Sequence, residues 1–176
     1  RVITRSVTRK GKEKQTDGGE FLNHMKNYKR SQISFGDVLG NGRSGVVFTA
    51  KLYKEVGALK MVDLYKREYL LQEILNEIKM YLGPLKEIQG ICIPRLLKFG
   101  ILHEAFAFTL TSLAEETFAT MGDNITRKQK QLAIKGLQEL HSKGVMHGDI
   151  RLENIVVKRK NDGSTSCVWW IDFGWS

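Results

Sequence analysis

The sequence of 176 residues predicts a single α+β domain behind a basic tail. Three observations support this prediction. Short runs rich in β-branched and aromatic residues follow one another through the first half of the chain. Two longer segments carry apolar residues at helical spacing, and the strands and helices do not alternate as they do in βαβ folds. The hydrophobic fraction of 41% is sufficient for a real core.

Residues 1–30 are polar and show little periodicity, so we expect a flexible tail or linker there, with a short helix around Phe21–Tyr28. They hold nine Lys/Arg and three Asp/Glu, a net charge of +6, whereas residues 31–176 hold 19 basic and 16 acidic residues. The basic excess therefore belongs mainly to the tail. A basic tail is compatible with nucleic acid, anionic membrane or a nuclear signal, but a solvated extension is the simpler interpretation, and nucleic acid is not required as a partner.

The first part of the expected domain, from residue 31, reads as an antiparallel meander of three strands. Ile33–Leu39 alternates as a strand does, Val46–Tyr53 is rich in β-branched and aromatic residues, and Val56–Val62 is a third apolar run. A glycine-rich turn separates the first two runs, and a short polar turn separates the last two. Strands that follow each other across short turns are expected to pair in an antiparallel sheet.

Two amphipathic helices are expected. In residues 66–82, apolar side chains recur at helical spacing, and a Gly-Pro pair at 83–84 ends or kinks the helix. Residues 126–143 form the second helix, with Thr126 as its N-cap and Gly144 as its stop.

Four further strands complete the expected elements. Two strand-like runs, near Arg95–Leu102 and Ala105–Thr111, lie between the helices. Two short strands, Ile155–Lys158 and Cys167–Ile171, follow the second helix, and the NDG sequence at 161–163 suits a hairpin between them.

Several classes of protein are disfavoured by composition. No apolar stretch approaches the length that spans a bilayer, and the first 14 residues contain no apolar core of a secretory signal. Cys92 and Cys167 form no disulfide framework and do not cluster with histidines as metal ligands would. We expect two reduced thiols in an intracellular protein, cytoplasmic or nuclear. Because the chain starts at Arg1, it is interpreted as a fragment or a processed product.

The glycine-rich stretch GNGRSGVV occupies residues 40–47. In a dinucleotide-binding unit a helix would follow Gly45, but VVFTAKLY reads as a strand. A glycine-rich loop between antiparallel strands is instead typical of a lid over nucleotide phosphates, because backbone N–H groups approach phosphate oxygens where no side chain obstructs them. An ordinary hairpin turn is the alternative. The sequence contains no GxxxxGK[ST], so a P-loop NTPase is not supported.

Lys60 ends the sequence GALK, directly after the glycine-rich hairpin. Its ammonium would reach toward phosphates under the loop and would need a carboxylate to hold it. Glu77, 17 residues further on in the first amphipathic helix, is the preferred partner, and Glu73, one turn earlier, is the competitor. The alternatives are a lysine that snorkels to solvent and glutamates on a solvated helix face.

The sequence HGDIRLEN at 147–154 and the later WIDFG have the composition of a phosphoryl-transfer site. Asp149 is the candidate base that receives a hydroxyl proton, and Arg151 is placed to neutralise charge on the transferred phosphoryl group. Asn154 and Asp172 offer the oxygen ligands that Mg²⁺ prefers. His147 is expected to support the loop.

These motifs occur in the order and rough spacing of the protein-kinase signature set, so the chain resembles the protein-kinase-like superfamily of Ser/Thr protein-kinase type. The resemblance runs from about Ile33 to Phe173. It implies a bilobal fold with a β-rich N-lobe containing one helix, about residues 31–113, and the beginning of a helical C-lobe, about residues 114–176. ATP would bind between the lobes, and a hydroxyl group on a protein would accept the phosphoryl group.

The resemblance also implies a role for each site residue. The glycine-rich loop would cover the phosphates, Val47 and Ala58 would line the adenine pocket, and Lys60 would hold the α- and β-phosphates. The residues of that loop are Gly40, Asn41, Gly42 and Gly45. Glu77 would pair with Lys60, and Asp149 would be the base. Asn154 and Asp172 would bind Mg²⁺.

The sequence departs from the family pattern at two positions of the catalytic loop. Gly148 stands where protein kinases usually have Arg, the residue that commonly pairs with a phosphorylated activation loop. The resemblance therefore gives no reason to expect activation by loop phosphorylation. His-Gly-Asp also resembles small-molecule phosphotransferases such as aminoglycoside and choline kinase-like enzymes. Arg151 replaces the usual Lys, a planar cation for a point charge, and this resembles divergent kinase-like proteins of fungal or microbial type.

The sequence stops at Ser176, just after Asp-Phe-Gly, before the activation segment and the later C-lobe helices of the family. We expect the isolated chain to expose apolar surface and to be marginally stable or to need a partner. Three functions stay open at this point: a protein kinase, a small-molecule kinase with the same core, and a truncated, non-catalytic nucleotide-binding module.

Overall fold

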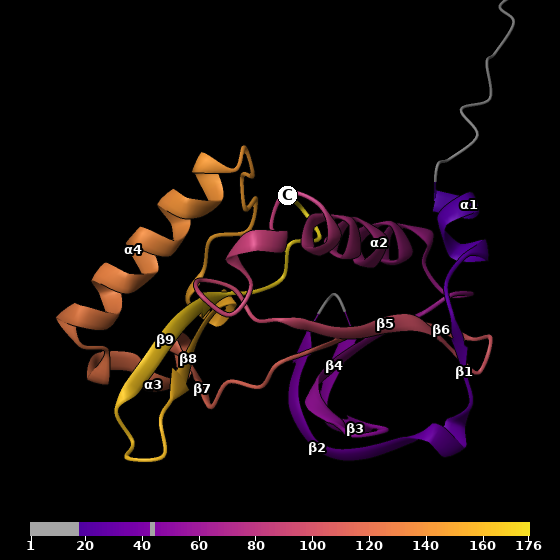
Figure 1. Cartoon of the computed structure of the whole chain (residues 1–176), viewed down its shortest axis with the longest axis horizontal. Helices are drawn as coiled ribbons and strands as arrows, with labels where there is room; N and C mark the ends of the chain where they lie inside the picture. Colours follow the sequence, from indigo (N-terminus) through magenta and orange to yellow (C-terminus); the bar gives the residue numbers. More distant parts are fainter. Residues whose placement is uncertain (1–17, 43–44) are drawn as a thin grey trace, which may run out of the picture.

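The computed structural model describes residues 18–42 and 45–176, and the strands in these ranges form two sheets. The smaller sheet lies between helix α4 (Arg127–Ser142) and the larger sheet, and helix α2 (Glu68–Leu82) lies along one side of the larger sheet (Figure 1). The α+β class is confirmed. No helix within the described ranges is both long and apolar enough to cross a bilayer.

The larger sheet has six strands in the order β1-β5-β6-β4-β3-β2. The meander expected from the sequence is present, because β2, β3 and β4 pair antiparallel in succession. The two later strands return to the same sheet: β6 pairs antiparallel with β4, and β5 with β6. The strands are β1 (Asn27–Tyr28), β2 (Ile33–Gly42), β3 (Gly45–Leu52), β4 (Glu55–Asp63), β5 (Leu96–Leu102) and β6 (Phe106–Thr111).

Residues 18–30 form ordered structure against the larger sheet. Helix α1 spans Gly18–Asn23, earlier than expected, and β1 pairs parallel with β5. Tyr28 is buried and contacts the ring of Phe108 edge-on, with 5.3 Å between the ring centroids. A flexible tail through residue 30 is therefore wrong for residues 18–30, because their apolar side chains fill part of the core; the expected tail at residues 1–17 lies outside the described residues.

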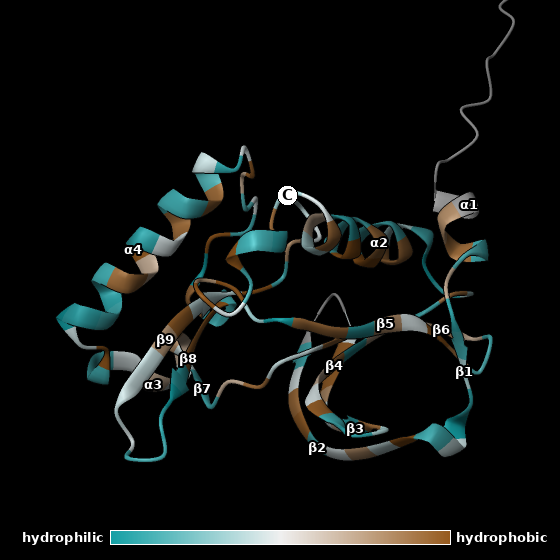
Figure 2. Cartoon of the chain, viewed as in Figure 1, coloured by the Kyte–Doolittle hydropathy of each residue, from teal (hydrophilic) through white to brown (hydrophobic). Residues whose placement is uncertain are grey.

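Helix α2 carries an apolar face onto the larger sheet. Its buried residues Ile74, Leu75 and Ile78 pack with Val62 of β4 and Ala107 of β6. Figure 2 shows the hydrophobic residues of this helix on the side that faces the sheet. The helix ends where expected, and the N–H of Gly83 donates to the carbonyl of Lys79. This packing fixes the orientation of the polar residues that α2 contributes to the site.

The smaller sheet and α4 share a second core. The strands β7 (Glu116–Thr117), β8 (Ile155–Arg159) and β9 (Thr165–Trp170) pair in that order, and all pairs are antiparallel. The expected hairpin around residues 161–163 therefore joins β8 and β9. The indole Nε1 of Trp170 donates to the carbonyl of Ala133 at 2.8 Å, which ties β9 to α4.

Helix α4 begins and ends within one residue of the predicted range 126–143, and Thr126 is its N-cap as expected. The hydroxyl of Thr126 accepts from the backbone N–H of Gln129 at 3.2 Å, and the Gln129 side chain accepts from the N–H of Thr126 at 2.8 Å. This reciprocal pair is a capping box. Gly144 follows the helix with a φ of 74°, a conformation that favours glycine. The remaining short elements are helix α3 (Phe118–Met121) and 3₁₀ turns at Arg30–Gln32, Lys86–Ile88, Gly122–Asn124 and Leu152–Asn154.

Candidate active site

The glycine-rich stretch is the hairpin between β2 and β3. Gly40 lies opposite Val47, Asn41 opposite Val46, and Gly42 opposite Gly45. Gly45 has a φ of 116°, and a Cβ there would lie 2.6 Å from the carbonyl oxygen of Met61. Only glycine fits so close to the backbone of β4. The loop is therefore placed directly beside the strand that carries Lys60, although residues 43–44 of its tip lie outside the described residues.

Strand register places Val47, Ala58 and Lys60 on one face of the larger sheet. Val47 lies opposite Lys60, and Ala58 is two residues before Lys60 on the same strand. Across the next pair of strands, Thr109 lies opposite Lys60 and Thr111 opposite Ala58. The two threonines therefore belong to the same face, although no sequence motif marks them. Only the register between β4 and β6 identifies them, because those strands are more than 40 residues apart.

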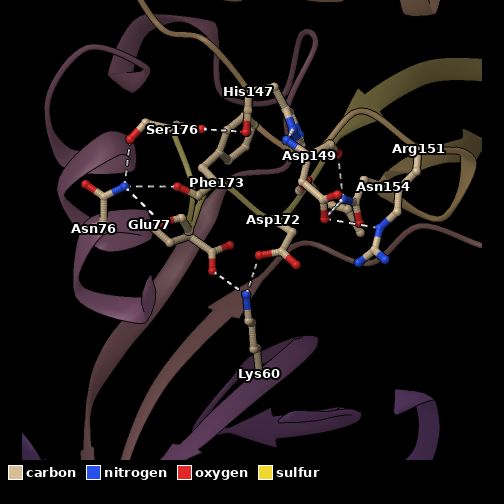
Figure 3. A network of polar contacts seen from close by, with 12 residues as sticks. Lys60, Asn76, Glu77, His147, Asp149, Arg151, Asn154, Asp172, Phe173 and Ser176 are labelled. Atoms are coloured by element: carbon tan, nitrogen blue, oxygen red, sulfur yellow. Dashed lines mark hydrogen bonds and ion pairs between the residues drawn. The ribbon is translucent and has the colours of Figure 1, made fainter. Parts of the chain in front are cut away.

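Lys60 contacts two carboxylates at once (Figure 3). Its Nζ lies 2.9 Å from Oε2 of Glu77 on α2 and 2.7 Å from Oδ1 of Asp172, which follows β9. The side chains of Lys60 and Glu77 are 12% and 5% exposed. Of the two glutamates considered from the sequence, it is therefore Glu77 that forms the ion pair with Lys60.

The three charges shift one another's pKa values. Burial alone would lower the pKa of Lys60, but the carboxylates of Glu77 and Asp172 outweigh burial and raise it above its usual range. Burial raises the pKa of Glu77, against the attraction of Lys60. Burial also opposes ionisation of Asp172, but the Lys60 ammonium overcomes it and lowers the pKa of Asp172. The cation is therefore firmly protonated, and Asp172 is its ionised partner.

Asp172 is held in an uncommon backbone conformation. Its φ is 67°, in the left-handed region that non-glycine residues rarely adopt. The next residue, Phe173, is fully buried, and its ring lies edge-on to Tyr81 of α2 with 5.7 Å between centroids. The ring of His147 lies 5.1 Å from that of Phe173. Packing of Phe173 between α2 and the loop at 147 thus fixes where the Asp172 carboxylate points.

Asp149, Arg151 and Asn154 form a second polar group beside the first. The Nδ2 of Asn154 donates to the carbonyl oxygen of Asp149 at 2.9 Å and to its Oδ2 at 3.0 Å. The Nε of Arg151 lies 3.1 Å from the same Oδ2. Asn154 is buried at the end of the 3₁₀ turn Leu152–Asn154, so its amide is a fixed support for Asp149. Figure 3 shows the Asp172 carboxylate between this group and Lys60.

His147 holds the loop in place through both of its ring nitrogens. It is 1% exposed, its Nε2 lies 2.9 Å from the carbonyl oxygen of Ile171, and its Nδ1 accepts from the N–H of Asp149 at 3.3 Å. These partners require a neutral ring with the proton on Nε2. Burial lowers the pKa of His147, in agreement with a neutral ring.

The oxygen donors of the site fit Mg²⁺ bound together with phosphate groups. Within the described ranges no cluster of three or more His, Cys, Asp or Glu side chains could hold a metal alone. Mg²⁺ is typically held by one or two carboxylates, substrate phosphates and water rather than by a cage of protein ligands. Asp172 supplies a carboxylate. The Nδ2 of Asn154 donates to Asp149, so the amide oxygen of Asn154 is left as an oxygen ligand for Mg²⁺.

Gly148 allows a close contact with the segment after Asp172. It has a φ of 74°, and a Cβ there would lie 2.5 Å from the carbonyl oxygen of Trp175. Any side chain at this position would therefore collide with the backbone of residue 175. The structure thus gives a steric reason for the glycine that the sequence shows between His147 and Asp149.

One polar contact of the site was not anticipated from the sequence. The side chain of Asn76, next to Glu77 on α2, donates to the backbone carbonyls of the segment that follows Asp172. An asparagine on a half-buried helix face carries no sequence signal for such a role. Its partners are backbone atoms almost 100 residues away.

Comparison with known proteins gives a family and several relatives. The model of the protein kinase domain family matches residues 33–176. Kinase suppressor of Ras 2 from Homo sapiens is 28% identical over 131 residues, covering 70% of this chain and 14% of that protein. Mitogen-activated protein kinase kinase kinase 17 from Arabidopsis thaliana is 27% identical over 150 residues, covering 79% of this chain and 38% of that protein. Cell division control protein 7 from Schizosaccharomyces pombe is 30% identical over 163 residues, covering 85% and 14%.

The chain spans between 14% and 38% of the length of these relatives. The family match runs from the start of β2 to the residues after Asp172, so it includes the site residues on both sheets and on α2. The chain therefore belongs to the protein kinase domain family.

Proposed function

We propose that this chain binds ATP with Mg²⁺ and transfers the terminal phosphoryl group to a hydroxyl group of a protein, on Ser or Thr. One observation carries the proposal: Lys60 contacts Glu77 and Asp172 at once, while Asp149 and Asn154 lie beside Asp172. Residues from β4, α2 and the loops after α4 and β9 thus meet at one place. The relatives that are named kinases support the same activity.

The nucleotide-binding face is the sheet face that carries Val47, Ala58 and Lys60. In the proposal, the first two contact the adenine ring, and the backbone N–H groups of the glycine-rich hairpin approach the phosphates. Lys60 holds the α- and β-phosphates, and Glu77 keeps its ammonium in place. Asp172 and Asn154 would hold Mg²⁺, which when bound neutralises charge on the phosphate oxygens.

Asp149 is the proposed base. The acceptor oxygen attacks the terminal phosphorus, the bond from that phosphorus to the bridging oxygen of ADP breaks, and the hydroxyl proton passes to the Asp149 carboxylate. Asn154 and Arg151 hold one oxygen of that carboxylate. Arg151 also offers a guanidinium next to the transferred group. The reaction is a direct transfer in which positioning and electrostatics supply the catalysis, without a covalent intermediate.

A small-molecule acceptor is the second candidate. It is favoured by Gly148, which gives the loop the His-Gly-Asp form of small-molecule phosphotransferases. A non-catalytic nucleotide-binding module is the third.

Two further predictions concern the whole chain. One is a lobe boundary near residues 113 and 114. The other is an intracellular location, cytoplasmic or nuclear, which the free thiols of Cys92 and Cys167 support.

Asp149→Asn tests the proposal. We expect Mg-ATP to raise the melting temperature of the wild-type chain and of this variant alike, because Asp149 is not placed on the nucleotide. Phosphoryl transfer from ATP labelled at the terminal phosphate should fall by about 10²–10⁴-fold in the variant, because the base is lost. Asp123→Asn, an exposed aspartate in the turn before α4, is the matched control and should retain full transfer.

The acceptors offered in this test separate the candidates. Transfer to a protein mixture supports the protein kinase, and transfer only to aminoglycosides or choline supports the second candidate. Binding of Mg-ATP without transfer to either pool would leave only the non-catalytic module. Failure of the wild-type chain to bind ATP in a Mg²⁺-dependent manner would refute the assignment of the whole site.

A further inference from the structure

The amide of Asn76 binds the backbone that follows Asp172 (Figure 3). Its Nδ2 lies 3.2 Å from the carbonyl oxygen of Phe173, 3.2 Å from that of Gly174 and 2.9 Å from that of Ser176. The N–H of Ser176 in turn donates to the carbonyl of Phe173 at 3.2 Å. One side chain of α2 thus gathers three carbonyl oxygens of a single tight turn.

Only a hydrogen-bond donor can occupy this place. Three backbone oxygens converge on one point, and an oxygen atom of a carboxylate or a reversed amide would be repelled by all of them. The primary amide of Asn76 has two N–H bonds for these three oxygens, so at least one N–H is shared between two acceptors. The side chain at position 76 therefore has to donate, and a carboxylate is excluded there.

The contact lies beside the Lys60 ion pairs and acts on the same two elements. Asn76 is adjacent to Glu77, and its acceptors begin one residue after Asp172. Lys60 joins Glu77 and Asp172 by charge, whereas the uncharged amide of Asn76 joins α2 to the backbone after Asp172 by hydrogen bonds. Since Asp172 has an uncommon φ of 67°, fixing the next carbonyls helps to hold it in that conformation.

The same turn is enclosed from two sides. On the α2 side, a Cβ on Gly174 would lie 3.0 Å from Cβ of Glu73. On the side of the catalytic loop, the hydroxyl of Ser176 donates to the carbonyl oxygen of His147 at 3.3 Å, and the carbonyl of Trp175 occupies the space that a side chain at 148 would need. At the position where protein kinases usually have Arg, this chain has Gly148, and the backbone of Trp175 packs against it.

We propose that Asn76 is a positioning residue, which holds Asp172 and Glu77 at Lys60 through hydrogen bonds to the backbone oxygens of Phe173, Gly174 and Ser176. With Gly148 admitting the same turn against the catalytic loop, the site assembles without a phosphorylated side chain. This inference rests on the proposed function and adds to it how the site is kept in order. Asn76 touches neither nucleotide nor acceptor in this role.

The first test measures the turn itself, in the chain without nucleotide. In Asn76→Asp, which keeps the size of the side chain but replaces its donors with oxygen, we expect hydrogen exchange of the peptide covering 171–176 to speed up about tenfold or more. Asn76→Ala, which removes the donors without adding charge, should show a smaller increase of the same kind. Gln72→Glu, the same change of amide to carboxylate at an exposed position one turn earlier on α2, is the matched control and should leave exchange unchanged.

The second test measures nucleotide affinity with and without Mg²⁺. We expect Asn76→Asp to reduce the gain in ATP affinity caused by Mg²⁺ by about tenfold, because Asp172 is displaced, and to leave metal-free affinity within about twofold. A fold that is merely loosened would lose both affinities together. The wild-type chain should display the full Mg²⁺-dependent gain in ATP affinity. Mass spectrometry of the sample used would check that it carries no phosphate.

The outcomes separate this inference from the proposed function. If the wild-type chain does not bind Mg-ATP, the proposed function fails, but the exchange measurement still decides the role of Asn76. Unchanged exchange at 171–176 in both Asn76 variants would overturn the inference. A Mg²⁺-dependent gain that appears only after phosphorylation of the wild-type chain would also overturn it.

Discussion

His147 is buried next to the candidate site, and its two ring nitrogens contact hydrogen-bonding groups of opposite kinds. The Nε2 faces a carbonyl oxygen of Ile171, which requires a donor, and the Nδ1 faces the N–H of Asp149, which requires an acceptor. Protonation would place a second N–H against the N–H of Asp149. The neutral ring is therefore part of the folded structure, and burial lowers its pKa accordingly.

Stability should fall as the pH drops below the ordinary histidine range. The pKa of His147 is lowered by folding, so the unfolded chain takes up the proton first, and the folded state loses stability as the pH falls below about 6.5. We expect the free energy of unfolding to decline between pH 7.5 and 5.5 with a slope of at most about 1.4 kcal/mol per pH unit from this residue.

Chemical denaturation across this pH range measures the effect. His147→Gln should be less stable at pH 7.5 but should show a flatter profile, whereas His141→Gln, at an exposed position of α4, should keep the wild-type slope. An identical slope in wild type and His147→Gln would contradict the assignment.

At the scale of elements, the segment before β2 is the clearest case in which packing adds to the domain. Strand β1 has only two residues, yet it extends the sheet through parallel pairing with β5. Tyr28 is 5% exposed and belongs to the same core cluster as Leu59 and Phe108. An aromatic ring of this size removes a large apolar surface from water, so a short strand is enough to anchor residues 18–30.

Tyr28→Ala tests whether this segment is part of the fold. We expect a loss of about 3–5 kcal/mol in the free energy of unfolding, because a large ring leaves a cavity in the core. Tyr65→Ala removes a tyrosine that is 81% exposed and should change stability by no more than about 0.5 kcal/mol. Equal effects in urea unfolding of the two variants would mean that β1 does not stabilise the sheet.

At the scale of the whole molecule, Lys60 is a charged link between the two sheets. It stands on β4 of the larger sheet, while Asp172 follows β9 of the smaller one. Two partly desolvated carboxylates depend on this one cation. Its removal would leave both without their counter-charge, which is costlier than the loss of an exposed ion pair.

We expect Lys60→Met to lower the free energy of unfolding by about 3–5 kcal/mol. The double variant Lys60→Met/Glu77→Gln should recover part of this loss, because the second change removes an unpaired buried carboxylate. Lys66→Met breaks the exposed pair with Asp63 and should cost no more than about 1 kcal/mol. Urea denaturation of the four proteins, wild type included, measures these differences. A double variant as unstable as Lys60→Met would show that Glu77 is not the source of the penalty.

Local chemistry explains how much of the fold could be predicted. The meander, α2, α4 and the β8–β9 hairpin could be predicted, and the structure contains them. Their signals are the periodicity, the Thr126 cap and the glycine turns, which are all properties of neighbouring residues. Strand β1 and the short elements β7 and α3 were not anticipated, because two to four residues carry no measurable period. They exist through pairing and packing with distant parts of the chain.

The sequence by itself determined the class of fold, the family resemblance and which residue types could do the chemistry, because motifs such as GALK, HGDIRLEN and IDFG are contiguous and their spacing can be counted. Only the tertiary structure decided which carboxylate Lys60 contacts, which residues share its face of the sheet, and why position 148 is glycine. It also showed that Asn76 binds the turn after Asp172. These features depend on strand register and on contacts between residues far apart in the chain, and such distances are set by packing rather than by local sequence.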